Sequence, residues 1–102
     1  MNEARLQLKI RKALIKQFGG KWVKWHGNRW GSAGMPDLVG CVGGQFYGIE
    51  VKMPGKHLTE LQAATLEEYE EVGAVVGVAT NLEEAISIVQ NHIDSRVLEA
   101  IK

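Results

Sequence analysis

The stretch that decides the fold is DLVGCVGGQFYGIEVK, residues 37–52. Its apolar residues fall into two runs separated by Gly43-Gly44, a glycine pair that favours a two-residue turn between antiparallel strands. The sequence therefore predicts a β-hairpin with strands over 37–42 and 46–52.

The turn fixes which residues face each other. If the two glycines form the turn, Val42 faces Gln45, and Asp37 then faces Glu50 on the same side of the sheet. Lys52 projects from that side as well, diagonally across from Asp37. A one-residue bulge would instead put the two acids on different faces.

Two opposed carboxylates need an explanation, because like charges at directly opposed strand positions are destabilising. One acid can hold a proton with a raised pKa, Lys52 can neutralise the pair, or a divalent cation can bind between them. Mg²⁺ and Mn²⁺ suit such oxygen ligands. The alternative is an exposed strand end where Glu50 and Lys52 form an ordinary surface pair. The register and the basic surroundings favour the metal.

Periodicity predicts the other elements. They are a helix over 3–18, a strand over 21–26, a glycine-rich loop over 27–34, a helix over 59–72, a strand over 74–79 and a helix from Asn81 to about His92. The order α-β-β-β-α-β-α predicts an α/β fold, a mixed sheet flanked by helices. The run AVVGVA, 74–79, is typical of a strand buried on both faces, and both faces of the hairpin are expected to be covered.

Composition indicates one domain over residues 1–102, with 45% hydrophobic and 24% charged residues as in soluble globular proteins. No apolar run approaches the ~20 residues of a membrane span. Cys41, the only cysteine, excludes an intrachain disulfide, favours a reducing, cytoplasmic location and is expected to pack inertly in its strand.

The net charge of zero divides unevenly along the chain. Residues 1–56 contain ten Lys or Arg and three Asp or Glu, whereas residues 57–102 contain two and nine. The two halves can simply neutralise each other across the fold. Alternatively, the basic half forms a surface for a polyanion such as DNA.

Two motifs carry a family resemblance. Pro36-Asp37 and, thirteen residues after Asp37, Glu50-Val51-Lys52 resemble the signature of PD-(D/E)XK nucleases. Together with GMPDLVG, GIEVK, LTELQ and the helix running into GAVVGVA, they resemble the VRR-NUC (virus-type replication-repair nuclease) family from about residue 3 to about residue 90.

The resemblance implies a restriction-endonuclease-like fold and a homodimeric, Mg²⁺- or Mn²⁺-dependent DNA endonuclease acting on branched DNA such as Holliday junctions. It also implies the cytoplasm of a bacterium or a phage-infected host cell, with no membrane and no small-molecule cofactor. Two rival functions are a catalytically silent nuclease-fold module for DNA binding or assembly, and a nuclease for simple duplex or single-stranded DNA. Loss of catalysis usually removes the acids or the lysine, and this chain has both.

The resemblance also implies roles for individual residues. Asp37 and Glu50 would be metal ligands, joined by the backbone carbonyl of Val51, and Lys52 would orient the attacking water and offset charge on the phosphate. Carboxylate-held metals supply what phosphodiester cleavage needs, a nucleophile at neutral pH and stabilisation of developing negative charge.

Two further site residues have competing explanations. Glu3 shares the angular position of the apolar stripe of its helix, and the family has an acid there that completes the metal site. Alternatively, it is a carboxylate favoured at a helix N-terminus. Gln62 matches a family glutamine near the metal or phosphate, or it closes a capping box with Thr59.

Candidate contacts to DNA phosphates are Lys24, His26, Arg29, Ser32 and Lys56. Each can equally be a solvated surface residue, and the serine can cap a turn. Trp22 and Trp25 are expected in the core or at a dimer interface, whereas Trp30 would stack on an unpaired base.

Overall fold

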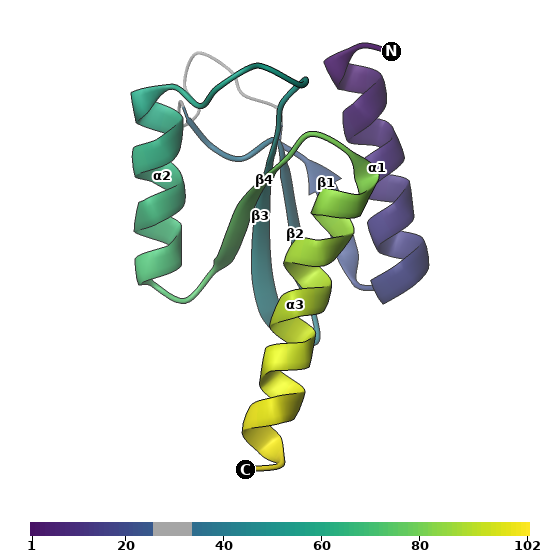
Figure 1. Cartoon of the computed structure of the whole chain (residues 1–102), viewed down its shortest axis with the longest axis vertical. Coiled ribbons are helices and arrows are strands. Elements are labelled where there is room, and N and C mark those ends of the chain that lie inside the picture. The colour runs from purple at the N-terminus through teal and green to yellow at the C-terminus, as the bar shows by residue number, and fades with distance from the viewer. Residues whose placement is uncertain (26–33) are drawn as a thin grey trace.

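The computed structural model describes residues 1–25 and 34–102, which form one sheet with helices on both faces (Figure 1). The elements are α1 (Glu3–Phe18), β1 (Lys21–Lys24), β2 (Leu38–Val42), β3 (Gln45–Val51), α2 (Glu60–Glu71), β4 (Val75–Ala79) and α3 (Leu82–Ala100). This order confirms the predicted α/β fold, with element ends within about three residues of expectation except at the end of α3.

The sheet is mixed, with strand order β1-β2-β3-β4. The first three strands are antiparallel neighbours, and β4 runs parallel to β3. Gly43 and Gly44 form the turn with φ of 56° and 81°, a left-handed geometry that glycine adopts without steric cost. Val42 faces Gln45, which confirms the predicted register.

The two faces of the sheet are covered differently. Figure 1 shows α1 and α3 on one face and α2 on the other. The α1/α3 face holds the core, where the buried stripe Leu6, Ile10 and Leu14 of α1 packs with Trp22 and Ile49. On the other face, α2 covers a smaller part of the sheet, because it packs mainly against β4.

That uneven cover corrects two expectations. Cys41 is exposed, because its side of β2 lies beyond the reach of α2. The strand at 74–79 is not buried on both faces: β4 is an edge strand, only Ala79 in it is buried, and Val78 is 38% exposed.

The two tryptophans expected in the core or at a dimer interface differ in exposure. Trp22 is buried in the core, whereas Trp25 is 40% exposed, so a dimer interface stays a prediction for Trp25.

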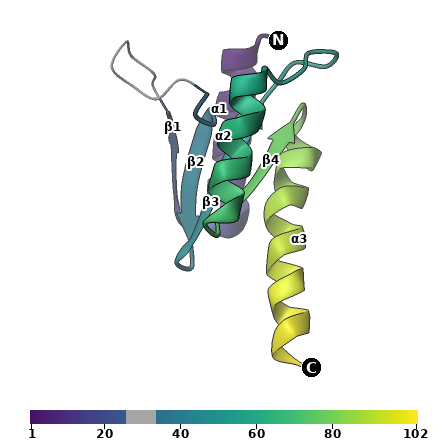
Figure 2. The same cartoon turned by 90° about the vertical axis from the view of Figure 1, so that its left-hand side faces the viewer.

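The last helix extends beyond His92, one of two outcomes that the sequence leaves open for residues 93–102. Its N-cap is Asn81, as expected, and Oδ1 of Asn81 accepts from the N–H of Glu84. The carboxylate of Glu84 accepts from the backbone N–H and hydroxyl of Thr80. The helix continues to Ala100 and projects past the sheet, as Figure 2 shows. Within the described ranges, no helix has the length and apolar content needed to cross a bilayer.

Candidate active site

The site lies where β2 begins and β3 ends. Asp37 comes directly before β2, and its backbone carbonyl accepts a hydrogen bond of 2.8 Å from the N–H of Trp25. Its Oδ2 accepts another of 2.8 Å from the N–H of Val51, the last residue of β3. Asp37 is thereby attached to both neighbouring strands, and its side chain reaches the residue beside Glu50.

Glu50 is buried with 1% of its surface exposed. Burial is the first cause that raises its pKa, to about 8 from an ordinary 4.5. The carboxylate of Asp37 beside it raises this pKa further, and Lys52 offsets part of the effect. The two acids therefore interact directly, as the hairpin register predicts.

One oxygen of Glu50 has no partner among residues 1–25 and 34–102. Oε1 accepts from Nε2 of Gln62 at 3.4 Å, whereas Oε2 is buried without a hydrogen bond to any of these residues. A buried polar atom without a partner is costly and is uncommon in native proteins. An unsatisfied carboxylate oxygen beside a second carboxylate is a donor set that fits a divalent cation of the Mg²⁺ type.

Among residues 1–25 and 34–102, no group of three or more His, Cys, Asp or Glu side chains is arranged to hold one metal ion. Glu3 lies in the first turn of α1, where Oε1 accepts from Nε2 of Gln7 at 3.4 Å. Its charge contributes to the raised pKa of Glu50, so the two lie in the same region, but its role as a ligand stays a prediction.

Gln62 satisfies both of its competing explanations. Its Oε1 accepts from the N–H of Thr59 at 3.0 Å, and its own N–H donates to Oγ1 of Thr59 at 3.1 Å, which is a complete capping box. The other end of the same amide donates to Glu50. The start of α2 is therefore connected to the acid pair through one side chain.

A close contact that the sequence analysis missed lies beneath the acids. A Cβ at Gly48 would lie 2.9 Å from Cγ of Pro36, a distance that real Cβ atoms essentially never show. Glycine at this position of β3 lets Pro36 lie against the strand, and Pro36 directly precedes Asp37. The spacing GIE, with the glycine two residues before Glu50 on the same face, is the signal that was available.

The remaining predicted site residues are placed as follows. Lys52 follows β3, is partly buried, and donates its backbone N–H to the carbonyl of Ala79 at 3.0 Å. Lys24 ends β1 and Lys56 lies before α2, and both are exposed. His26, Arg29 and Ser32, together with Trp30, lie outside the described residues.

Comparison with known proteins gives one informative result. No family model and no curated protein matches this chain. A solved structure of a VRR_NUC domain is similar to it, with a TM-score of 0.69 and 26% identity over 86% of this chain and 94% of that one. The resemblance inferred from the sequence motifs thus extends to the three-dimensional fold.

Proposed function

Because this chain has a VRR-NUC-like nuclease fold, we propose that it is a metal-dependent DNA endonuclease that hydrolyses phosphodiester bonds. The observation that carries the proposal is the buried Glu50 beside the half-buried Asp37, with Oε2 of Glu50 lacking a partner among the described residues. Two neighbouring carboxylates at the end of a sheet destabilise the fold unless a bound cation offsets their charge. Titratable groups with perturbed pKa values of this kind are frequent at functional sites.

The proposed roles follow from position. Asp37, Glu50 and the carbonyl of Val51 would hold Mg²⁺ or Mn²⁺, with Glu3 as the family-based addition. When bound, such an ion stabilises charge on the phosphate and provides a nucleophile at neutral pH. Lys52 supplies a cation beside the pair, suited to orient the attacking water and to offset phosphate charge. Gln62 holds Glu50 in place through its Nε2.

The proposed substrate is branched DNA, such as a Holliday junction, cut by a homodimer. The basic N-terminal half, with ten Lys or Arg against three acids, provides the electrostatic attraction for DNA. The exposed apolar residues Val97, Leu98 and Ile101 at the end of α3 are available for contact between subunits. Two active sites related by a two-fold axis would match two strands to be cut.

The test is a cleavage panel with purified protein. Supercoiled plasmid, a four-way junction, a flap, linear duplex and single strands are incubated with Mn²⁺, Mg²⁺ or EDTA. The proposal expects products only with metal, most rapidly on branched DNA, and none from Asp37→Asn. Binding without cleavage under every metal would favour a silent DNA-binding module, and equal or faster cutting of simple duplex or single strands would overturn the branched substrate.

A further inference from the structure

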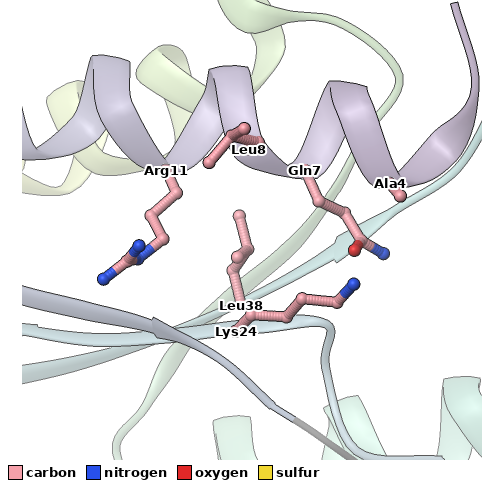
Figure 3. A pocket seen from close by; sticks show the side chains of 6 residues that line it. All are labelled: Ala4, Gln7, Leu8, Arg11, Lys24 and Leu38. Atoms are coloured by element: carbon pink, nitrogen blue, oxygen red, sulfur yellow. The ribbon is translucent and has the colours of Figure 1, made fainter.

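A cavity of about 290 Å³ lies between α1 and the sheet, at the end where β1 stops and β2 begins (Figure 3). Its lining residues are Ala4, Gln7, Leu8, Arg11, Lys24 and Leu38. Figure 3 shows the side chains of Gln7 and Arg11 descending from α1, with Lys24 extending beneath Gln7. This α1–β1 cavity lies on the face of the sheet opposite the acid pair, at the same end.

Gln7 is the unusual residue of the cavity. It is 5% exposed, and its Nε2 donates to Glu3, but its Oε1 is buried without a hydrogen-bond partner in the part of the chain that the structure describes. A buried amide oxygen left unsatisfied costs the desolvation of the group. A ligand with an N–H donor would remove that cost.

The cavity has one cation at each end, because Lys24 extends beneath Gln7 whereas the guanidinium of Arg11 lies away from it (Figure 3). Nε of Arg11 donates to the backbone carbonyl of Trp22 at 2.7 Å, which anchors the guanidinium at the cavity. Lys24 is exposed and long enough to adjust to an anion. Leu8 and Leu38 add apolar surface. The lining therefore combines an acceptor for an N–H group, two positive charges and an apolar wall.

We propose that the α1–β1 cavity binds one unpaired nucleotide of the DNA strand that is being cut, with the base donating to Oε1 of Gln7, one flanking phosphate held by Lys24 and the other by Arg11 at the opposite end of the cavity. This inference rests on the proposed nuclease function and specifies its substrate. The volume lies near the lower limit of about 300 Å³ for ligand pockets, which suits one nucleotide and excludes a base pair.

The position of the cavity connects it with the acids. Lys24 is paired with Leu38, the residue that follows Asp37, and Gln7 is hydrogen-bonded to Glu3. A strand whose phosphate lies at the acids would place a nearby nucleotide at this sheet end. A base stacked and paired in a duplex cannot enter such a cavity. The branched substrate is therefore one with an unpaired nucleotide near the cleaved bond, such as a flap or a junction with unpaired nucleotides at its branch point.

The test measures binding without cleavage. Fluorescence anisotropy in EDTA compares a labelled duplex that has a gap of unpaired thymidines with the same duplex whose gap nucleotides are abasic. Wild type is expected to bind the thymidine gap about three- to tenfold more tightly, the range of one recovered hydrogen bond. Gln7→Met, which keeps the side-chain shape, and Ala4→Trp, which fills the cavity from an exposed position, are expected to abolish the difference.

Two lysine variants separate base from phosphate. Lys24→Met is expected to weaken binding to both gaps by the same factor, whereas Lys21→Met, on the same strand but outside the cavity, is expected to weaken binding to either gap by less. Equal binding of both gaps by wild type would overturn the proposal, as would an unchanged preference in Ala4→Trp. No effect of Lys24→Met would overturn the phosphate contact.

The outcome is distinguishable from failure of the nuclease proposal. Asp37→Asn is expected to lose cleavage and keep the preference for thymidine, because the cavity lies on the other face. If the wild-type protein cuts no DNA but shows the base preference, the proposed nuclease function is contradicted and the proposed nucleotide site is not. Thymidine monophosphate binding as tightly as the gapped strand would contradict a DNA strand as the occupant.

Discussion

At the scale of single residues, Glu50 is the decisive group. Its carboxyl is buried, adjoins Asp37, and keeps one oxygen without a partner. Removing Glu50 from water disfavours its charged form, so a metal-free site holds a proton that the same group would lose in an unfolded chain. The chemistry of the site therefore has a signature in stability as well as in activity.

The first prediction concerns pH. The folded pKa of Glu50 is about 8 against an ordinary 4.5, so between these values the folded protein retains a proton that the unfolded chain has released. The free energy of unfolding then decreases as pH rises through this window. Urea unfolding in EDTA measures the free energy of unfolding of wild type and Glu50→Gln at about pH 4 and about pH 9. The difference between variant and wild type is expected to shift in favour of Glu50→Gln at the higher pH. The exposed Glu60→Gln is the control, and parallel pH profiles for wild type and Glu50→Gln would contradict the account.

The second prediction separates the two ends of the Gln62 amide. Thr59→Ala removes only the cap and is expected to cost about 1 kcal/mol of stability without changing Mn²⁺ affinity. Gln62→Met removes the cap acceptor and the donor to Glu50, so it is expected to lower both stability and Mn²⁺ affinity. Unfolding and Mn²⁺ titration of both variants check this. Equal Mn²⁺ affinity in the two variants would show that the contact with Glu50 is unimportant.

At the scale of elements, local signals predicted most of the fold. The Gly43-Gly44 turn predicts the hairpin register, and that register predicts that Asp37 lies beside Glu50. The cap residues Thr59 and Asn81 marked two helix starts in the same way. Each of these features depends on residues close in sequence, which is why the sequence specifies them.

The errors concern contacts between distant segments. An apolar run such as VVGVA is compatible with a central or an edge strand, and only the position of β4 beside β3 decides it. The exposure of Cys41 depends on how far α2 extends across the sheet. The cavity between α1 and β1, and the unsatisfied amide in it, likewise depend on how a helix docks. Periodicity carries no information on such distances.

The third prediction concerns the packing of Trp22 of β1 against Gly40 of β2, its partner in the neighbouring strand. A Cβ at Gly40 of β2 would lie 2.3 Å from the ring of Trp22, which is 1% exposed. Gly40→Ala is therefore expected to destabilise the protein by about 1–3 kcal/mol through overpacking. Cys41→Ala, one residue further and exposed, is the matched control and is expected to be near neutral. Thermal or urea unfolding measures both, and equal stabilities would contradict the close contact.

At the scale of the whole molecule, charge is divided between the two halves of the chain. The basic excess belongs to residues 1–56, which supply α1, the hairpin and the acid pair, and the acidic excess belongs to residues 57–102. The first half has three acids, Glu3, Asp37 and Glu50, and all three are proposed as metal ligands. A single domain, a homodimer and a cytoplasmic location stay predictions.

The fourth prediction tests whether residues 1–56, the basic half of the chain, bind DNA phosphates. Binding of Asp37→Asn to gapped DNA is expected to weaken steeply with salt, because each neutralised phosphate contributes about −0.9 to the slope of log K against log salt concentration. Lys24→Met is expected to reduce the magnitude of that slope by about 1. Arg96→Met, in the acidic half, should leave it unchanged. A slope that is the same in all three proteins would contradict phosphate contact by Lys24.

The central claim is that Asp37 and Glu50 together form a site for a divalent cation. Isothermal titration of the metal-free protein with Mn²⁺ tests it most directly, with Glu50→Gln and Asp37→Asn as variants and Glu60→Gln as control. Saturable binding by wild type and the control, with loss of binding in both site variants, is the predicted result. Absence of binding by wild type, or equal affinity in Glu50→Gln, would contradict the claim.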